Sequence, residues 1–405
     1  MKLTVNGKEL HGTIPAIASK SMAHRLLICA ALSGDPSQIR CETVSEDISA
    51  TAECLSALGC ELTYTGGTYY ASPYRHPERA VIDCKESGST LRFLLPVICA
   101  LGITARLNMK GKLPSRPLSP LYGELEKHGA RMSPEGESPL LVSGKLRGGT
   151  YTLKADVSSQ FISGLLFALP LCEEDSQIIL TGRRESPSYV DMTLSALRAY
   201  GIKINETKDG YQIPAKQKYR SPGSVSVEGD WSNAAFWLSA AALGAPLTVT
   251  GLAHDSLQGD RAISSLLDKL TSSESKIFID AEDVPDLVPI IAVVAAAQKK
   301  TTVIYNASRL RLKESDRIGT TATLIRAMGA SVSQTEDGLR IKGAPEKLHP
   351  ATMDASGDHR IAMAAAIASV VCGDVTILGS NAVNKSYPSF FEDFRRLGGT
   401  VTSIF

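Results

Sequence analysis

The sequence lacks the features that mark membrane, secreted or nucleic-acid-binding proteins. Its 43 Lys and Arg residues almost balance its 42 Asp and Glu residues, and aromatic residues make up only 6% of the chain, which disfavours a nucleic-acid reader. Residues 1–7 alternate like a strand and have no apolar core of a signal peptide. The longest strongly apolar runs, such as residues 287–297, are too short to span a bilayer. We therefore expect a cytoplasmic protein that acts neither on nucleic acid nor at a membrane.

Metal and nucleotide motifs are missing as well. The 8 cysteines include no C-x-x-C pair, and none is spaced with His in the manner of metal ligands. They read as buried free thiols of a reducing compartment. The chain has no Gly-x-x-x-x-Gly-Lys-Ser/Thr loop, and no Gly-x-Gly-x-x-Gly follows an expected strand. The sequence therefore predicts no metal site and gives no support for a nucleotide cofactor.

What the chain does contain is an internal repeat. A helical segment that ends in Gly and leads into an alternating strand recurs along the chain, with the glycines at positions 59, 129, 201, 329 and 398. Residues 266–270 form a sixth copy of the helix without the Gly. Gly suits such a stop because it adopts the left-handed conformation without a Cβ clash. The five copies that end in Gly and the sixth copy without it predict six units. Because a chain of 405 residues exceeds the usual size of a single core, we expect these units to form two domains of three.

Each unit also contains an Ala-rich apolar helix that leads to a strand. Such helices have no polar face, so we expect them to be buried inside an α/β fold. The segment 216–229, which contains Pro222-Gly223, is the best candidate for a linker. The expected helices are residues 21–32, 91–101, 161–171, 234–243, 287–297 and 361–372.

Cations stand where the second helix of a unit is expected to begin. Lys313 and Arg317 are four residues apart, which would place them on one helix face, and Glu314 lies beside them in a setting suited to proton transfer. The alternative is a solvated, salt-bridged helix start. Capping explains the Ser, Asp and Pro residues at the other helix starts, but not the cations, because positive charge opposes the helix dipole unless an anion is bound. The unexplained cations are Lys20, Arg25, Arg116, Lys313, Arg317, Arg360 and Lys385. They predict anionic ligands held between the two domains.

In this order and over essentially the whole chain, these segments resemble the EPSP synthase family. The matching motifs are Ser19-Lys20-Ser21 with Arg25, Arg116-Pro117, Ser158-Ser159-Gln160, Pro285-Asp286, Lys313-Glu314-Ser315-Asp316-Arg317, Asp358-His359-Arg360 and Lys385. The resemblance implies a two-domain inside-out α/β barrel of six βαβαββ repeats, three per domain. One domain would comprise residues 1–15 and 229–405 and the other residues 16–228, with the active site in the cleft between them.

The resemblance also implies a reaction. The enolpyruvyl group of phosphoenolpyruvate would pass to the 5-hydroxyl of shikimate 3-phosphate, on the route to chorismate and the aromatic amino acids. Asp286 and Glu314 would be the acid–base pair, and Lys20 would share in the proton transfer. No cofactor is expected, and we expect a monomer. Phosphoenolpyruvate would be held by Lys20, Gly88, Arg116, Gln160, Arg317, Arg360 and Lys385. Shikimate 3-phosphate would be held by Lys20, Ser21, Arg25, Ser158, Ser159, Gln160, Ser186, Tyr189, Asp286 and Lys313.

Two positions depart from the family pattern, and two other functions remain open. Glu86 stands where many members have Asn, and Arg309 stands where some have a substrate-binding Asn. One alternative is UDP-N-acetylglucosamine 1-carboxyvinyltransferase, which shares the fold but typically has a Cys in the loop before the Arg equivalent to Arg116; residues 111–115 contain none. The other is a non-catalytic anion-binding module, which would not need positioned carboxylates such as Asp286 and Glu314.

Overall fold

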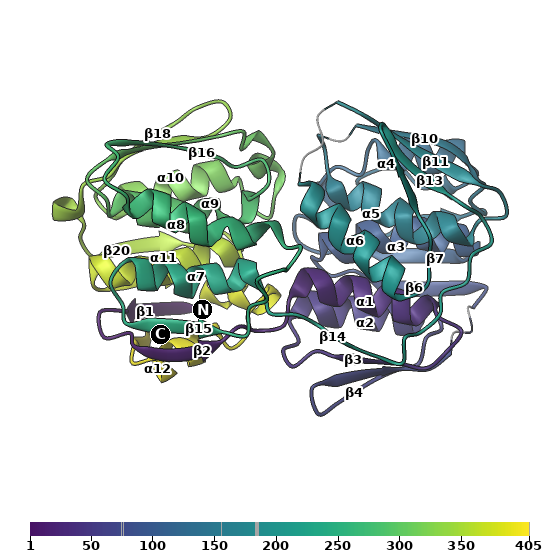
Figure 1. Cartoon of the computed structure of the whole chain (residues 1–405), viewed down its shortest axis with the longest axis horizontal. Coiled ribbons are helices and arrows are strands. Elements are labelled where there is room, and N and C mark those ends of the chain that lie inside the picture. Colours follow the sequence, from purple (N-terminus) through teal and green to yellow (C-terminus); the bar gives the residue numbers. More distant parts are fainter. Residues whose placement is uncertain (74, 76, 155, 183–185, 405) are drawn as a thin grey trace. The chain divides into compact units, whose positions relative to one another are not determined.

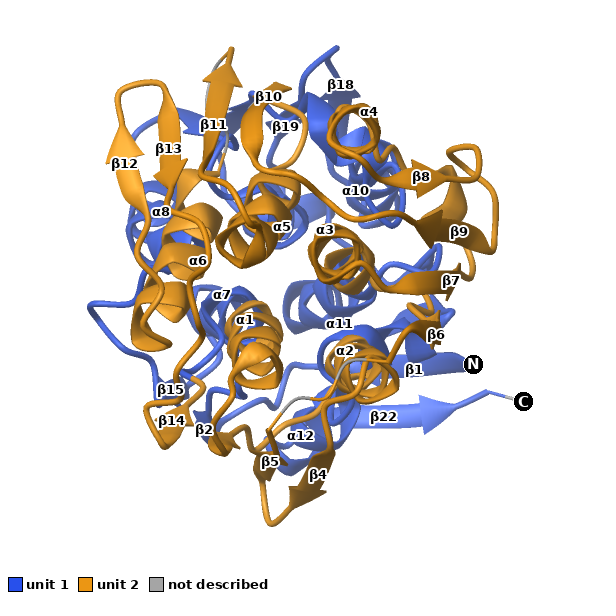
Figure 2. Cartoon of the chain, turned by 90° about the vertical axis from the view of Figure 1, so that its right-hand side faces the viewer, with its two compact units in different colours: residues 1–19, 228–405 blue, residues 20–227 orange. Residues whose placement is uncertain are grey.

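The computed structural model describes residues 1–73, 75, 77–154, 156–182 and 186–404. The chain forms two compact units: unit 1 comprises Met1–Ser19 and Glu228–Phe405, and unit 2 comprises Lys20–Val227 (Figures 1 and 2). The domain bounds expected from the sequence differ from these by four residues at the first crossing and by one at the second. Unit 1 is therefore discontinuous in sequence, and unit 2 is inserted within it.

A six-element repeat builds most of both units. In one copy, β6 (Arg79–Asp83) runs parallel to β7 (Thr104–Asn108), and β9 (Leu140–Ser143) pairs antiparallel with both β7 and β8 (Arg131–Met132). Parallel neighbours need a crossover connection, which α3 (Gly88–Leu101) supplies, and α4 (Leu121–Lys127) joins β7 to β8. The order is therefore βαβαββ. The other copies in unit 2 are β14 (Ser224–Ser226), α1 (Lys20–Leu32), β3 (Ser37–Arg40), α2 (Glu46–Ala57), β4 (Leu62–Thr65) and β5 (Thr68–Ala71), and then β10 (Gly149–Lys154), α5 (Ser159–Ala168), β11 (Ser176–Thr181), α6 (Pro187–Ala199), β12 (Asn205–Thr207) and β13 (Gly210–Ile213).

Unit 1 contains two more complete copies and one that is shorter. In the shorter copy, β2 (Gly12–Pro15) pairs parallel with β15 (Leu247–Thr250), and within the described residues this sheet has no further strand. Its helices are α7 (Trp231–Ala242) and α8 (Ile263–Thr271), and the chain continues from α8 into a strand of the next sheet. This is the copy that lacks the terminal Gly. The complete copies are β16 (Lys276–Asp280), α9 (Val288–Ala296), β17 (Thr301–Tyr305), α10 (Arg317–Ala327), β18 (Ser331–Gln334) and β19 (Leu339–Lys342), and then β20 (Ala351–Asp354), α11 (His359–Cys372), β21 (Val375–Leu378), α12 (Phe390–Arg396), β22 (Thr400–Ser403) and β1 (Lys2–Asn6).

In each unit the Ala-rich helices lie inside and the sheets form the outer faces (Figures 1 and 2). Every residue of α9 is buried, whereas side chains along β6 alternate between exposed and buried. Small residues let the inner helices approach closely: a Cβ added to Gly164 of α5 would lie 2.3 Å from the carbonyl oxygen of Arg92 in α3. The predicted burial of these apolar helices is confirmed.

The glycines that end the second helices have the predicted conformation. Their φ angles are +104° at Gly59, +108° at Gly129, +76° at Gly201, +96° at Gly329 and +94° at Gly398. Residues with a Cβ atom rarely adopt positive φ angles, so Gly recurs at these positions because the backbone there must take a left-handed conformation.

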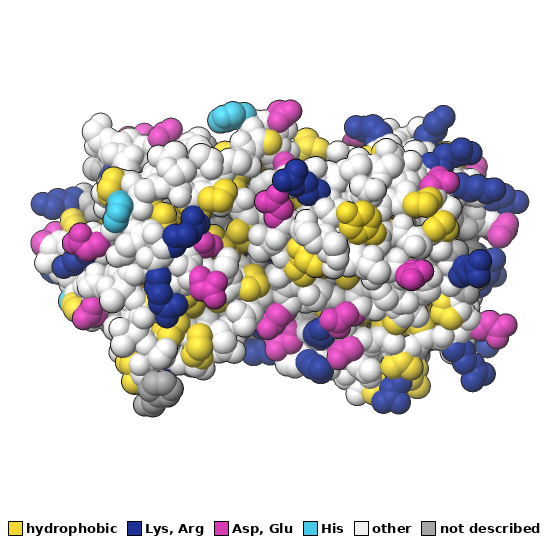
Figure 3. All heavy atoms as spheres, turned by 90° about the horizontal axis from the view of Figure 1, so that it is seen from below, with side chains coloured by type: hydrophobic (Ala, Val, Ile, Leu, Met, Phe, Trp, Pro, Cys, Tyr) yellow, Lys and Arg dark blue, Asp and Glu magenta, His cyan; other side chains and the backbone are white. Residues whose placement is uncertain are grey.

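Surface and cysteine features also bear on the predictions. All eight cysteines fall within the described residues and are buried, and none of them forms a disulfide. Among the helices of the described residues, none has the length and apolarity needed to cross a membrane. On the face seen in Figure 3, Lys and Arg side chains are interspersed with Asp and Glu side chains, in keeping with the balanced composition.

Candidate active site

Arg317, the first residue of α10, organises the carboxylates of unit 1. Its Nη1 lies 2.6 Å from Asp286 Oδ1, its Nη2 lies 2.8 Å from Glu314 Oε2, and its Nε lies 2.8 Å from Asp358 Oδ2. The Arg317 side chain is 1% exposed, whereas those of Asp286 and Glu314 are 21% and 22% exposed. The guanidinium of Arg317 is therefore a buried cation, and the two carboxylates that it binds, Asp286 and Glu314, are partly exposed to solvent.

Arg360 joins the same group, which we call the Arg317 cluster: Arg317, Asp286, Glu314, Asp358 and Arg360. Arg360 is the second residue of α11, and its Nη2 lies 3.3 Å from Asp286 Oδ2. The backbone N–H of Arg360 donates to Asp358 Oδ1 at 2.9 Å, so Asp358 caps α11 while it also binds Arg317. The buried Nε of Arg360 has no hydrogen-bond acceptor among the described residues. The sequence-predicted residues Asp286, Glu314, Arg317 and Arg360 are thus brought together.

The electrostatics of this cluster favour an ionised Asp286. Burial by itself would raise the pKa of Asp286, but the charges of Arg360, Arg317 and Lys313 hold it well below its usual range. Burial by itself would lower the pKa of Arg317, but its three carboxylate partners outweigh this effect and raise the pKa well above its usual value. In this state Asp286 is an anion, and an anion is the form in which a carboxyl group can accept a proton.

Lys313 lies beside the cluster with an altered basicity. Burial lowers its pKa to about 8; the neighbouring charges of Arg309 and Arg317 add to that effect, and Asp286 and Glu314 oppose it. Arg309 is held in place by a hydrogen bond from its Nη2 to the carbonyl oxygen of Glu282. The departure at position 309 therefore adds a positive charge that acts on Lys313.

The geometry around Lys313 corrects one prediction. Lys313 has an extended backbone, with φ −85° and ψ −159°, and α10 begins only at Arg317, so the two cations do not share a helix face. Lys385 likewise ends a 3-10 helix, where its Nζ donates to the carbonyl oxygen of Gly357 at 2.8 Å, and Arg116 directly follows another. Lys313, Lys385 and Arg116 therefore lie at the ends of 3-10 helices that precede an α-helix, whereas Arg317 and Arg360 lie in the first turn of one.

Unit 2 carries a second group, the Arg116 cluster: Gly88, Arg92, Arg116 and Gln160. A Cβ added to Gly88 would lie 2.7 Å from Arg116 Nη1 and 3.2 Å from Arg92 Nη1, so only Gly leaves room for both guanidinium groups. Arg92 Nη1 donates to Gln160 Oε1 at 2.7 Å, and Gln160 Nε2 donates to Ser89 Oγ at 2.9 Å. The buried Nε of Arg116 finds no acceptor within the described part of the chain. Cations and fixed amide dipoles are thus gathered at the N-terminus of α3.

Arg25 is packed differently from what a ligand-binding cation would require. It is 2% exposed, and its three donor groups are directed to the Thr193 Oγ1, the Ser21 carbonyl oxygen and the Tyr189 carbonyl oxygen, at 2.8, 2.6 and 2.7 Å. Burial lowers the pKa of Arg25 to about 10. In this structure Arg25 ties α1 to α6 and thereby positions Ser21 and Tyr189. Its predicted contact with shikimate 3-phosphate stays a prediction.

The remaining predicted residues of unit 2 lie at helix starts. Lys20 is the first residue of α1, and its Nζ lies 2.8 Å from Asp47 Oδ2. Ser158 caps α5 by accepting from the backbone N–H of Gln160 at 3.3 Å, and Ser159 is the first helical residue. Ser186 precedes α6 with φ +49° and makes no side-chain cap. The second departure from the family, Glu86, packs over Gly111, where an added Cβ would lie 2.5 Å from Glu86 Cδ.

Two residues of these clusters were not among the sites predicted from the sequence. Asp358 lies in the motif Asp358-His359-Arg360 and Arg92 in the expected helix 91–101, but a helix-capping Asp and an Arg in the first turn have ordinary structural explanations. Their partners are distant in sequence, Arg317 for Asp358 and Gln160 for Arg92, so only the fold reveals the contacts. The described residues contain no group of three or more His, Cys, Asp or Glu side chains arranged to hold a metal ion.

The chain is similar to known proteins along almost its whole length. The sequence profile of EPSP synthase (3-phosphoshikimate 1-carboxyvinyltransferase) matches residues 5–394. A 3-phosphoshikimate 1-carboxyvinyltransferase of Clostridium novyi is 42% identical over 421 residues, covering 97% of this chain and 96% of the relative. One from Clostridium acetobutylicum is 44% identical over 418 residues, covering 98% and 97%.

Solved structures resemble the fold. An EPSP synthase from Acinetobacter baumannii superposes with a TM-score of 0.82 at 22% identity and covers 100% of both chains. The enolpyruvyl transferase NikO from Streptomyces tendae gives a TM-score of 0.77 at 19% identity, covering 99% of this chain and 98% of the other. At these identities the likeness establishes the α/β fold of repeated sheet–helix units.

Proposed function

This chain belongs to the EPSP synthase family, and from that premise we propose that it transfers the carboxyvinyl group of phosphoenolpyruvate to the 5-hydroxyl of shikimate 3-phosphate. The products are 5-enolpyruvylshikimate 3-phosphate and phosphate, on the route to chorismate and the aromatic amino acids. The observation that carries the proposal is the pairing of two part-exposed carboxylates, Asp286 and Glu314, on one buried guanidinium.

Phosphoenolpyruvate carries a phosphate and a carboxylate, and the site offers cations to both. We propose that these groups are bound by Lys20, Gly88, Arg116, Gln160, Arg317, Arg360 and Lys385. The open Nε donors of Arg116 and Arg360 support this assignment, because a buried donor without an acceptor costs free energy until a ligand supplies one. A charge-assisted contact of this kind contributes roughly 1.5–3 kcal/mol.

Shikimate 3-phosphate carries a phosphate, a carboxylate and hydroxyl groups. For this substrate we propose Lys20, Ser21, Arg25, Ser158, Ser159, Gln160, Ser186, Tyr189, Asp286 and Lys313. Ser158 and Ser186 support the proposal through their positions before α5 and α6, where backbone N–H groups can bind an anion.

The chemistry requires two proton transfers of opposite direction. The 5-hydroxyl loses its proton to Asp286 as its oxygen attacks C2 of phosphoenolpyruvate, and the acid form of Glu314 gives a proton to C3, which becomes a methyl group and leaves Glu314 as a carboxylate. In the second step the C2–O bond to phosphate breaks, the methyl group returns a proton, and the C2–C3 double bond re-forms. Lys20 can share in these transfers. Such groups typically accelerate a step by roughly 10²–10⁴.

The Arg317 cluster suggests how substrate binding prepares the base. Arg317 and Arg360 keep the pKa of Asp286 low. An anion that binds these guanidinium groups offsets their charge, so the pKa of Asp286 rises toward the range in which a carboxylate accepts a proton readily. The base is thus activated when phosphoenolpyruvate is bound.

A direct assay tests the proposal. Phosphate release should require both shikimate 3-phosphate and phosphoenolpyruvate, and mass spectrometry should detect the enol ether. UDP-N-acetylglucosamine serves as the control acceptor. Phosphate release with the control acceptor instead would identify the alternative transferase, and no release with either would point to an anion-binding module.

The state and location of the enzyme belong to the same proposal. We take it to act as a monomer, because one chain supplies every residue of the proposed site, and to act in the cytoplasm, because eight free buried thiols suit a reducing compartment. Gel filtration of the active protein tests the first point, and fractionation of cells that express it tests the second.

A further inference from the structure

Asp260 is a buried carboxyl group that the proposed reaction does not use. It lies in the 3-10 helix η3 (Gly259–Ala262) and is 2% exposed. Its Oδ2 accepts a hydrogen bond from Ser232 Oγ, and its buried Oδ1 has no partner among the described residues. An ionised carboxylate with an open oxygen is costly to bury, so its presence here needs a physical explanation.

Ser232 links Asp260 to the Arg317 cluster. The side chain of Ser232 donates to Asp260, and the carbonyl oxygen of the same residue accepts from Arg360 Nη1 at 2.9 Å. The other terminal nitrogen of Arg360, Nη2, lies 3.3 Å from Asp286 Oδ2. The four residues form a continuous chain of contacts from a buried carboxyl group to the proposed base.

The charges that face Asp260 come from three neighbouring elements. They are Asp286 before α9, Arg360 in α11 and Asp230 at the N-cap of α7. Burial raises the pKa of Asp260 to about 7, and Asp286 and Asp230 add to this effect, while Arg360 and the bond from Ser232 oppose it. Asp260 therefore favours the protonated form and Asp286 the ionised form, although the charge of Arg360 acts on both carboxyl groups.

We propose that Asp260 is a positioning residue that, through Ser232, orients Arg360 toward an anionic substrate and does so in its protonated form. This inference rests on the proposed function, in which Arg360 binds phosphoenolpyruvate. An ionised Asp260 would place a second negative charge beside Arg360 and compete with the substrate anion. A protonated Asp260 keeps the contact with Ser232 but carries no charge, so it does not compete with the substrate anion for the positive charge of Arg360.

This arrangement couples substrate binding to proton uptake. Above about pH 7 the free enzyme has an ionised Asp260, and binding of an anion at Arg360 raises the pKa of Asp260 so that it takes one proton from solvent. The affinity for phosphoenolpyruvate must then fall as pH rises, by up to roughly tenfold per pH unit. Lys313 also titrates in this range, so the effect of Asp260 is read from the ratio between wild type and variant.

The decisive variant is Asp260→Asn, which retains an oxygen to accept from Ser232 but cannot ionise. Its KM for phosphoenolpyruvate should match that of wild type near pH 6 and rise less steeply between about pH 7 and pH 9. Asp260→Ala removes the acceptor, so its KM should be high at every pH while the Asn variant restores it. The matched control is Asp268→Asn on the exposed side of α8, which should follow the wild-type profile. An Asp260→Asn profile parallel to that of wild type would overturn the proposal.

A second measurement does not depend on turnover. Between about pH 4 and pH 7 the folded state retains the proton of Asp260 and the unfolded chain releases it, so the contribution of Asp260 to the free energy of unfolding declines over this interval. The urea midpoint of Asp260→Asn should decline less than that of wild type. Equal declines would refute the buried proton. If wild type released no phosphate, the proposed function would be wrong, and the urea comparison would still decide whether Asp260 holds a proton.

Discussion

Arg317 Nη1 lies 2.6 Å from Asp286 Oδ1, so the proposed base is paired with a buried cation. The same guanidinium contacts Glu314 and the fully buried Asp358. Removing two charges from water is costly, and partners must be well placed to offset that cost. The placement of Arg317 is therefore both a structural requirement of unit 1 and the means by which the basicity of Asp286 is set.

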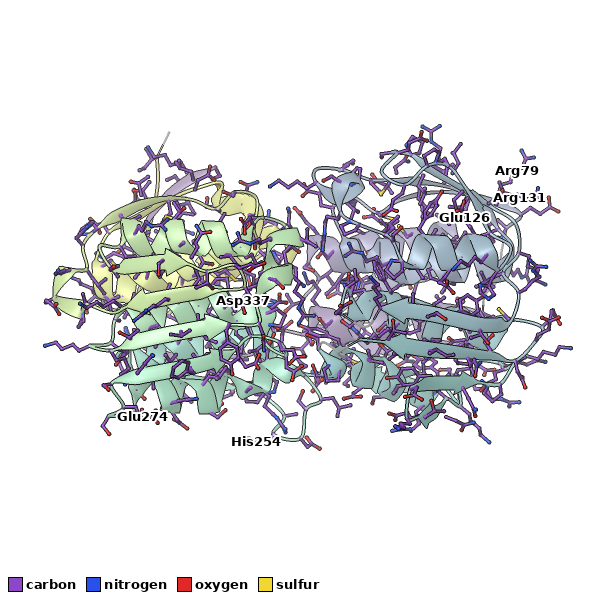
Figure 4. The ribbon with its side chains drawn as sticks, turned by 90° about the horizontal axis from the view of Figure 1, so that it is seen from above. Arg79, Glu126, Arg131, His254, Glu274 and Asp337 are labelled. Carbon is purple, nitrogen blue, oxygen red and sulfur yellow. The ribbon has the colours of Figure 1, made fainter. Side chains whose placement is uncertain are left out.

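The first prediction concerns the two carboxylates. Asp286→Asn and Glu314→Gln should each reduce turnover by roughly 10²–10⁴, because each removes a group that moves a proton in the proposed reaction. Both variants keep a similar shape, so they should still fold and bind shikimate 3-phosphate. The measurement is phosphate release at saturating substrate, with calorimetry for binding. The control is Glu274→Gln, at a surface position (Figure 4). Near-normal turnover in either site variant would remove that residue from the mechanism.

The second prediction concerns stability. Arg317→Met should lower the free energy of unfolding by about 3–5 kcal/mol, because Asp358 is left as a buried charge without its main partner. Arg311→Met is the matched control: the Arg311–Asp316 pair spans 3.0 Å but is partly exposed, so its loss should cost about 1 kcal/mol or less. Urea denaturation measures both. Equal losses in the two variants would show that burial of the Arg317 cluster does not matter.

The third prediction is a pH dependence set by Lys313. Because its pKa is lowered to about 8, Lys313 loses its charge as pH rises through that value, and KM for shikimate 3-phosphate should then increase. Lys313→Arg stays charged and should remove the increase. Arg309→Asn takes away a charge that lowers this pKa, so the increase should begin at higher pH. A KM for shikimate 3-phosphate that is flat up to about pH 9 in wild type would contradict the assignment.

The fourth prediction is that turnover survives metal removal. The guanidinium and ammonium groups of the proposed site supply the positive charge that Mg²⁺ brings to many phosphate sites. Treatment with EDTA followed by dialysis should leave the rate unchanged. A loss of rate that a divalent ion restores would show that the proposed cations are insufficient.

The repeat was predictable from sequence because its signals are local. Gly59 and Gly398 mark a backbone conformation that other residues avoid, and the apolar helices have no polar face to expose. The shorter copy was harder to recognise, because the helical pattern of α8 is intact although, within the described residues, β15 pairs with β2 alone. Helix periodicity reports on one segment at a time, whereas strand pairing depends on segments far apart in the chain.

The candidate site was predictable in its residues but not in its contacts. The cations were singled out because capping could not explain them, yet Lys313 proved to lie in an extended turn. Asp358 was hidden by an adequate local explanation as a helix cap, although it also binds Arg317, 41 residues earlier in the chain. Asp260 carried no local signal, because its burial and its link to Ser232 arise only from packing.

The last prediction tests the space at Gly88. In Gly88→Ala the new Cβ would lie 2.7 Å from Arg116 Nη1, closer than non-bonded atoms allow. Because the atom it meets ends a flexible side chain, the fold should persist and Arg116 should move. The displaced guanidinium would lose a charge-assisted contact to phosphoenolpyruvate, so KM for that substrate should rise by roughly 10-fold to 100-fold, with a smaller change in kcat.

Gly123→Ala is the matched control for this variant. Gly123 lies in α4, and a Cβ added there would meet nothing within 4 Å. It should leave KM unchanged and should raise stability by up to about 1 kcal/mol, because Ala favours the helix. Steady-state kinetics with both variants separates a steric effect on Arg116 from the general effect of a Gly-to-Ala change. An unchanged KM in Gly88→Ala would mean that Arg116 does not bind phosphoenolpyruvate from the position it occupies beside Gly88.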